Sequence, residues 1–382
     1  MTIPSLVGTM TTLIHLDLSY SGFMGSIPLQ IGNLSNLNYL GLSNVANGTI
    51  PSQIGNLSNL LHLNLGVNLG DDDVFIENID CLSSLSRLEY LELGGANLSQ
   101  SFHCLHTLQA LPSLMHLHLS RSILPHYNQP SFLNFSSLLT LEFSNIDYRS
   151  PTFFIPNWVF RLKNLVSLIL SSNKIEGPIP DGFQNLTLIE NLDLNGNLFS
   201  SSIPDLFYNS LPRLMFLDLS SNYLEGIIPD VLGNVTSLVT LDLSSNQLEG
   251  PIPTSLGNVT SLVTLELSEN RLKGSLPTTL GNLTSLVILD LSFNQLEGPI
   301  PTSLGDAISL VELRLSDNRI SGNLTNHFEN FKNVIYIDFS KNKLGGELPI
   351  SLGKISSLKV LILFSNCLSG NPFESLGSLS KL

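Results

Sequence analysis

The stretch that decides the fold is Gly233–Leu304. It reads GNVTSLVTLDLSSNQLEGPIPTSL, GNVTSLVTLELSENRLKGSLPTTL and GNLTSLVILDLSFNQLEGPIPTSL in three successive segments of 24 residues. The first and third segments differ at three positions. Self-similarity at a fixed period of this length is typical of a solenoid, in which each repeat packs on its neighbours. The sequence therefore predicts stacked coils.

The local pattern predicts the path of one coil. Leu241 and Leu243 alternate with polar residues, which indicates a short strand with one buried and one exposed face. Pro251 and Pro253 then exclude an α-helix, so we expect an extended return with one 3₁₀ turn near Thr254–Leu256. Because the chain comes back in the same direction after each repeat, successive strands must pair in parallel.

An asparagine completes the repeat. The Asn246 amide is expected at a buried bend, donating to a backbone carbonyl and accepting from the N–H of a neighbouring coil. The nine later coils share this residue, as Asn173, Asn197, Asn222, Asn246, Asn270, Asn294, Asn318, Asn342 and Asn366. The first six coils hold Ser21, Val45, Asn68, Ala96, Ser122 and Ile146 there. We therefore expect the N-terminal part to be less stable.

The repeats predict one domain over 1–382, with 1–158 irregular and 159–382 regular. We expect an α/β-type solenoid, a right-handed superhelix of about 15 repeats of ~24 residues. Its concave side is a parallel sheet, and its convex side is extended or 3₁₀. Two longer repeats, with insertions around Asp72 and Phe154, are expected to bulge away from the sheet.

The pattern LxxLxLSxNxLxGxIPxxLGNLTS resembles the plant extracellular type of leucine-rich repeat, and the resemblance covers nearly the whole chain. The chain is similar to part of the ectodomain of a plant receptor-like protein or receptor kinase, above all to immune receptor-like proteins of the fungal-xylanase-receptor type. The resemblance implies a cysteine-bearing cap before the repeats, and a cap, a membrane helix and a tail after them. We recognise none of these, so we expect an uncapped fragment or a truncated gene model of a longer secreted protein.

The composition of the chain limits the classes of partner that it could bind. Charged residues make up 13% of the chain and the formal net charge is −14. An acidic chain without a Lys/Arg run argues against nucleic acid and anionic membrane surfaces. No apolar run approaches the roughly 18 residues of a membrane helix. The segment Met1–Met10 does not read as a signal peptide. We expect the full-length protein on the extracellular side of the plasma membrane, held there by segments missing from this chain.

Catalytic and cofactor motifs are not recognised. The sequence has no nucleophile elbow, metalloprotease pattern or phosphate-binding loop. His116 and His118 point to one face of a strand, but no third metal ligand is evident and solvated histidines are favoured. We therefore expect no enzyme, no cofactor and no metal.

The three cysteines are an odd set. Cys81 and Cys104 are favoured as two buried thiols over a disulfide, although sequence does not settle their pairing. Cys367 follows the asparagine position and is expected to be a small buried apolar residue.

Two rows of outward residues are candidates for ligand binding on the concave face. The first five coils carry an aromatic row that departs from the usual repeat, and aromatic side chains make good anchors for protein partners. Its members are His15, Tyr39, His62, Tyr90 and His116, with His118 beside them. A later acidic row consists of Asp193, Asp218, Asp242, Glu266 and Asp290, with Phe216 next to it. Because L-D-L-S is the usual wording of the repeat, a structural role for the acidic row is a strong alternative.

Asn-x-Ser/Thr sequons support a secretory route. They are Asn33, Asn47, Asn56, Asn97, Asn134, Asn185, Asn234, Asn258, Asn282 and Asn323. Many of them coincide with the GNLT wording of the repeat, which weakens the signal. None falls on an outward strand position, so glycans would leave the sheet bare.

We expect a ligand-recognition ectodomain that binds a protein or peptide. The resemblance implies defence signalling through a co-receptor or adaptor kinase. Two alternatives stay open: a soluble apoplastic inhibitor of pathogen hydrolases, and a piece of a receptor-kinase ectodomain.

Overall fold

The computed structural model describes residues 2–23, 25–45, 50–67, 79–101, 103–125, 133–147, 154–204, 210–324, 328 and 330–371. Three features named above lie outside these ranges: the sequon Asn47, the bend residue Asn68 and the insertion around Asp72. The chain divides into two compact units, Met1–Ile175 and Glu176–Leu382. Each unit is described by itself.

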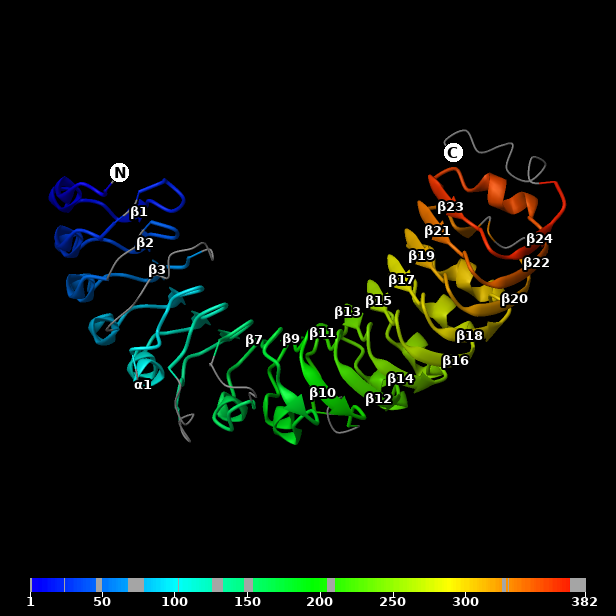
Figure 1. Cartoon of the computed structure of the whole chain (residues 1–382), viewed down its shortest axis with the longest axis horizontal. Helices are drawn as coiled ribbons and strands as arrows, with labels where there is room; N and C mark the ends of the chain where they lie inside the picture. Colours follow the sequence, from blue (N-terminus) through cyan, green and yellow to red (C-terminus); the bar gives the residue numbers. More distant parts are fainter. Residues whose placement is uncertain are drawn as a thin grey trace. The chain divides into compact units, whose positions relative to one another are not determined.

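The first unit carries one parallel sheet whose strands follow the order of the chain (Figure 1). Its strands are β1 (His15–Asp17), β2 (Tyr39–Gly41), β3 (His62–Asn64), β4 (Tyr90–Glu92), β5 (His116–His118), β6 (Thr140–Glu142) and β7 (Ser167–Ile169). Neighbouring strands pair without a shift, so that Leu40 lies opposite Leu16 and Leu63. The predicted parallel pairing is confirmed.

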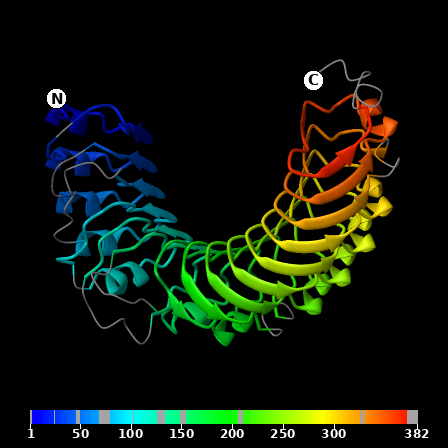
Figure 2. The same cartoon turned by 45° about the vertical axis from the view of Figure 1, so that its right-hand side comes forward.

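The second unit contains two parallel sheets (Figures 1 and 2). The main sheet consists of β9 (Asn191–Asp193), β11 (Phe216–Asp218), β13 (Thr240–Asp242), β15 (Thr264–Glu266), β17 (Ile288–Asp290), β19 (Glu312–Arg314), β21 (Tyr336–Asp338) and β23 (Val360–Ile362). The second sheet has nine strands on the return limbs. They are β8 (Glu176–Gly177), β10 (Leu198–Ser201), β12 (Tyr223–Ile227), β14 (Gln247–Gly250), β16 (Arg271–Ser275), β18 (Gln295–Gly298), β20 (Arg319–Asn323), β22 (Lys343–Glu347) and β24 (Cys367–Ser369). The sequence predicted the extended limbs but not their pairing into a sheet.

Short 3₁₀ helices complete most coils, and proline precedes many of them. They are η1 (Ser5–Thr9), η2 (Leu29–Asn33), η3 (Ser52–Asn56), η4 (Asp80–Ser84), η5 (Val159–Arg161), η6 (Asp181–Asn185), η7 (Asp230–Asn234), η8 (Thr254–Asn258), η9 (Thr278–Asn282), η10 (Thr302–Asp306) and η12 (Ile350–Lys354). The turn predicted near Thr254 is η8. One coil of the first unit instead forms a short α-helix, α1 (Cys104–Gln109).

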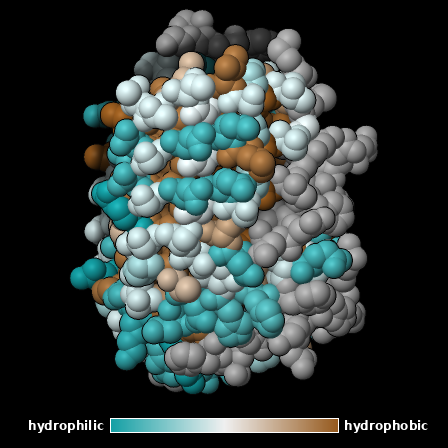
Figure 3. Space-filling view, turned by 90° about the vertical axis from the view of Figure 1, so that its left-hand side faces the viewer, coloured by the Kyte–Doolittle hydropathy of each residue, from teal (hydrophilic) through white to brown (hydrophobic). Residues whose placement is uncertain are grey.

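Leucine side chains fill the interior of each coil. Leu241, Leu243, Leu248 and Leu256 are each 0% exposed, and Ile252 is 2% exposed. The face shown in Figure 3 carries mostly hydrophilic and intermediate residues, with the hydrophobic residues in narrow rows between them. The stacked coils therefore share one continuous apolar spine within each unit.

The asparagine ladder of the second unit pairs the backbone groups at the bend. Asn246 donates its amide N–H groups to the carbonyl of Leu243 in its own coil, at 3.2 Å, and of Leu219 in the preceding coil, at 2.9 Å. Its oxygen accepts the backbone N–H of Leu224 at 3.0 Å. Asn270 repeats the pattern one coil later. The predicted role of this asparagine is confirmed.

In the first unit Asn173 makes the same kind of bonds, accepting the backbone N–H of Ile146 at 2.8 Å and donating to the carbonyl of Leu170 at 2.9 Å, whereas earlier coils pair this region differently. Ser122 donates its hydroxyl to the carbonyl of Leu93 in the preceding coil at 2.9 Å, which replaces one bond of the ladder. Backbone bonds supply others: the N–H of Leu98 donates to Ile123, and the N–H of Ile123 donates to Ala96. The lost amides are thus partly replaced by direct bridges between coils.

The cysteines are free thiols. Cys104 is buried, which raises the pKa of its thiol to about 11, and burial also raises the pKa of Cys81. The prediction that Cys367 is buried was wrong: its side chain is exposed. The residue after the ladder asparagine points outward, as the exposed Tyr223 and Arg271 show.

Replacing one ladder asparagine tests its contribution. We expect Asn270→Ala to lower the free energy of unfolding by about 2–3 kcal/mol, because it leaves buried backbone groups without partners. Urea unfolding followed by circular dichroism measures the change. Arg271→Ala, in the same coil at an exposed position, is the control. Equal losses for the two variants would contradict the role of the ladder.

Candidate functional site

The predicted aromatic row is a continuous series of ring contacts on the first unit, and we call it the aromatic ladder. Its members occupy the first position of β1 to β5 and lie opposite one another across neighbouring strands. His15 and Tyr39 stack with centroids 4.1 Å apart, and His62 and Tyr90 stack at 5.5 Å. Tyr39 lies 6.0 Å from His62, and Tyr90 lies 6.1 Å from His116. The in-register parallel pairing brings residues 23 to 28 positions apart into contact.

Two ring pairs of the aromatic ladder are stacked, and the other two are tilted by 33° and 40°. The edges of the rings, which carry hydroxyl groups and ring nitrogens, are what the sheet offers to a ligand. Burial, and then the charge of Asp17, raises the pKa of Tyr39, and burial also raises the pKa of Tyr90. Both hydroxyls are therefore neutral donors. Burial lowers the pKa of His116 below its usual value.

Glu142 on β6 is tightly held. His118 lies 2.7 Å from one of its oxygens, while Ser120 and Ser144 donate to the other. The hydrogen bond from His118 is the main reason that the pKa of Glu142 falls to about 2. His118 also packs on Tyr90, with centroids 5.0 Å apart, so the aromatic ladder and this carboxylate are joined.

Glu92 on β4 lies in a contrasting environment. Its Oε1 accepts the backbone N–H of Gly94 at 2.6 Å. Its Oε2 receives no hydrogen bond in the described part of the chain. Burial raises the pKa of Glu92, and the charge of Glu142 acts in the same direction. Two neighbouring glutamates therefore differ in the sense of their pKa shifts.

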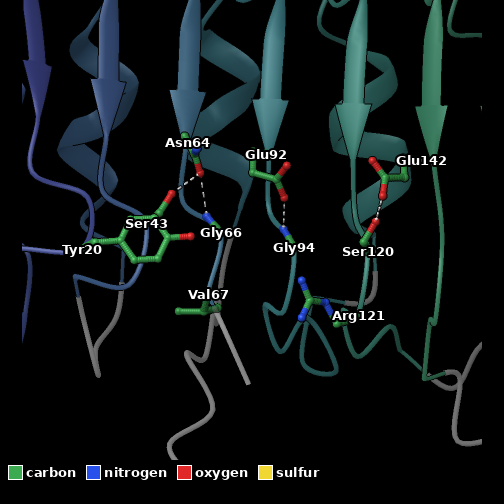
Figure 4. Close-up of a pocket in the computed structure, with 10 residues that line it drawn as sticks. All are labelled: Tyr20, Ser43, Asn64, Gly66, Val67, Glu92, Gly94, Ser120, Arg121 and Glu142. Atoms are coloured by element: carbon green, nitrogen blue, oxygen red, sulfur yellow. Dashed lines mark hydrogen bonds between the residues drawn. The ribbon is translucent and has the colours of Figure 1, made fainter. Parts of the chain in front are cut away.

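A hollow of about 230 Å³ lies at the carboxyl ends of these strands (Figure 4). We call it the glycine pocket, because Gly66 and Gly94 stand where neighbouring coils carry Ser43 and Ser120. The missing side chains open the space, and Tyr20, Val67 and Arg121 are among the other residues that line it. Sequence reasoning missed this pocket. Glycine at the serine position of L-x-L-S in two consecutive coils was the available signal.

The acidic row of the second unit is a regular structural feature. Asp193, Asp218, Asp242, Glu266 and Asp290 lie opposite one another on successive strands, and Phe216 lies on β11 beside the row. Ser220 donates its backbone N–H and its hydroxyl to Asp218, at 2.8 and 2.6 Å. Asp242 accepts the N–H of Ser244 at 2.8 Å in the same way. The aspartate of the L-D-L-S sequence therefore stabilises the turn after the strand by accepting these hydrogen bonds.

An arginine ends the acidic row. Arg314 on β19 lies 3.6 Å from Asp290 and 2.8 Å from Glu312, and its guanidinium is 5.1 Å from the ring centre of Tyr336. No ion pair with Asp218, Asp242 or Glu266 is formed by the described residues. Burial, followed by repulsion from neighbouring carboxylates, raises the pKa of Glu266, and burial is also the main cause for Asp242.

The sequons lie away from the main sheets. Six of the asparagines end 3₁₀ helices, and these are exposed: Asn33, Asn56, Asn185, Asn234, Asn258 and Asn282. Asn134 and Asn323 are also exposed. Asn97 is 1% exposed and accepts the N–H of Ser99, so its buried amide offers no place for a glycan. We therefore remove Asn97 from the candidates.

Within the described ranges, no group of three His, Cys, Asp or Glu side chains lies close enough to hold a metal ion. None of the helices in the same ranges has the length and apolar character needed to cross a membrane.

The fold and the repeated sequence pattern define the class of protein. A family model described as leucine rich repeat matches residues 200–248. A second model of that description matches 12–34, 164–186, 188–210, 261–283, 285–307 and 309–331. The matched segments and the fold show a solenoid built of leucine-rich repeats.

The relatives that the chain resembles are plant receptor-like proteins, which agrees with the resemblance seen in the sequence. The chain is 31% identical to Receptor-like protein EIX1 of Solanum lycopersicum over 204 residues, 51% of this chain and 17% of that protein. It is 42% identical to Receptor-like protein 18 of Arabidopsis thaliana over 206 residues, 54% of this chain and 24% of that protein. The matches thus span a quarter or less of these relatives.

A solved structure agrees with this assignment. The Arabidopsis receptor kinase HAESA, in complex with the peptide hormone IDA and the co-receptor SERK1, superposes with a TM-score of 0.76 at 31% identity. The match covers 97% of this chain and 60% of that chain.

The two glutamates provide a paired pH test. We expect Glu142→Gln to lower the thermal midpoint at pH 7, because the ionised form is the one that the fold stabilises. Because the pKa of Glu142 is lowered, its ionised carboxylate stabilises the fold fully at pH values above 4.5, which is the ordinary pKa of the group. That stabilisation is lost as the pH falls towards about 2. The deficit of the variant should therefore shrink between pH 4.5 and 2.5.

Glu92→Gln should not lower the thermal midpoint at pH 7, in contrast to Glu142→Gln. The pKa of Glu92 is raised, so ionisation at pH 7 costs stability, and the amide oxygen of glutamine still accepts the N–H of Gly94. We expect an unchanged or higher thermal midpoint at pH 7. Two equal losses at that pH would show that the two environments do not differ in this way.

Proposed function

We propose that this chain is the ligand-recognition part of a plant cell-surface receptor-like protein, and that it binds a protein or peptide on the outward face of the first unit. The aromatic ladder carries the proposal. Its residues depart from the usual repeat sequence in five successive coils and form one surface of contacting rings. The similarity to receptor-like proteins and to a receptor kinase solved with a peptide hormone supports the same conclusion.

The chemistry of the face suits a peptide. Ring edges, hydroxyl groups and the glycine pocket offer closely spaced hydrogen-bonding groups on a rigid parallel sheet. Aromatic side chains bury a large area at a low entropic cost, which makes them effective anchors at interfaces. Exposed sequons at the ends of the 3₁₀ helices would place glycans away from this face.

The remaining parts of the proposal concern the whole protein. We infer that it is located on the extracellular side of the plasma membrane, that it signals in defence through a co-receptor or adaptor kinase, and that it recognises its ligand without catalysis. The co-receptor named in the HAESA complex supports a partner of that kind.

Glycan insertion tests the face. Asp17 is exposed on β1, next to the start of the aromatic ladder, and is followed by Leu18 and Ser19. Asp17→Asn creates a sequon there, and the new amide still accepts the N–H of Ser19. The probes are peptides selected from a random phage-displayed library on the whole chain produced in plant cells. We expect the glycan, verified by mass, to weaken their binding at least tenfold.

The control makes the same charge change without the sugar. Asp17→Asn combined with Ser19→Ala removes the sequon and should keep the binding near that of the parent. The same pair of variants at Asp242 and Ser244 examines the acidic row, where we expect little effect. Undiminished binding with a glycan at residue 17, or loss only with one at residue 242, would overturn the assignment to the first unit.

A further inference from the structure

The walls of the glycine pocket are held in place by internal hydrogen bonds. Asn64 accepts the hydroxyl of Ser43 at 2.5 Å and the N–H of Gly66 at 3.1 Å. Glu142 accepts from His118, Ser120 and Ser144. The hydrogen-bonding capacity of these groups is already used within the protein, so they form the walls of the pocket without a ligand.

Other groups around the pocket are left open. The carboxylate of Glu92 is oriented by its bond to Gly94, but its Oε2 receives no hydrogen bond from a described residue. The side chain of Arg121 is exposed at the rim and makes no hydrogen bond or ion pair with a described residue, although its charge acts on Glu92. In Figure 4 Arg121 lies below Gly94, farther from the strands. A half-buried carboxylate with one open oxygen is complementary to a hydrogen-bonding cation.

We propose that the glycine pocket binds one cationic side chain of a peptide ligand, with Glu92 Oε2 as its acceptor and arginine as the preferred residue. The proposal rests on the proposed function for the peptide nature of the ligand. A guanidinium is planar, weakly hydrated and always charged, which suits a shallow carboxylate site better than an ammonium does.

The size and lining of the pocket agree with this occupant. About 230 Å³ is smaller than the roughly 300–1,000 Å³ of typical small-molecule sites and matches a single side chain. Val67 offers an apolar wall for the aliphatic stem. The exposed ring of Tyr20 lies at the rim, where aromatic rings attract cations.

Arg121 distinguishes a cationic ligand from other ligands. A carboxylate or a sugar would gain a donor from this arginine, and its removal would weaken binding. A cation would be repelled by it, so its removal would strengthen binding. Arg121 has a left-handed backbone with φ 60°, and the equivalent residues Asn44 and Asn145 have φ 55° and 53°. Arg121→Asn is therefore compatible with the local backbone.

The test uses the whole chain labelled with ¹⁵N-glycine and two small probes. N-acetyl-arginine methylamide carries the guanidinium, and N-acetyl-citrulline methylamide is its neutral counterpart of nearly equal shape. The amide signal of Gly94 reports on Glu92, because the two groups are hydrogen-bonded. We expect a saturable shift with the arginine probe and at least tenfold weaker binding of the citrulline probe.

Variants separate the contributions. Glu92→Gln should weaken the binding of the arginine probe at least tenfold, and Arg121→Asn should strengthen that binding about threefold. Gly66→Ala, which places a methyl group in the pocket 3.1 Å from the Glu92 side chain, should weaken it at least threefold. Glu225→Gln, an exposed change on β12, is the matched control and should have no effect.

Several results would overturn the proposal. These are the absence of a saturable shift, equal binding of the two probes, or weaker binding after Arg121→Asn, which would indicate an anionic or polyol ligand. Because the probes are single residues, these results are independent of the glycan test. Loss of peptide binding with a glycan at residue 17, together with no probe binding, would reject the pocket and keep the recognition face.

Discussion

The structure depends on one constraint: the backbone groups at the bend after each strand are buried and need partners. In the second unit the asparagine ladder supplies them. Asn246 joins its own coil to the preceding one through a carbonyl of Leu219 and the N–H of Leu224. Because this bond pattern uses only the side chain at the bend, the outward strand positions are free to vary without loss of the fold.

The coils before Asn173 in the first unit meet the same constraint in another way. Ser122 and direct backbone bonds between coils replace part of the ladder. In the same unit the outward positions carry the aromatic ladder, the paired Glu142 and the open Glu92. The second unit uses its outward aspartates to fasten the turns after its strands. We interpret the regular coils as the more stable scaffold and the irregular coils as the part specialised for recognition.

Sequence alone predicted much of this arrangement. The period placed Leu256 inside and Asn270 at the bend, and the recurring strand leucines placed the aromatic row in one register although its coils differ in length. The second sheet was missed because Gly and Pro indicate extended backbone without indicating its partners. Cys367 was mispredicted from the apolar character of cysteine, although its position in the coil points outward.

The site was predictable only in part. The aromatic row stood out because its residues depart from the repeat, but a pocket made by Gly66 and Gly94 is defined by side chains that are missing. The contrast between Glu92 and Glu142 depends on which serines and histidines reach each carboxylate. Hydrogen bonds of this kind are set by side-chain conformation, which residue spacing does not determine.

The most direct test of the account is hydrogen exchange followed by mass spectrometry on the whole chain. In a solenoid, local stability is a sum over coils and their neighbours, so protection should follow the ladder. The account predicts slow exchange for amides such as Leu248 and Leu272, which donate to ladder asparagines, and faster exchange at Leu98 and Ile123. Equal protection in the two units, or slower exchange in the first, would contradict it.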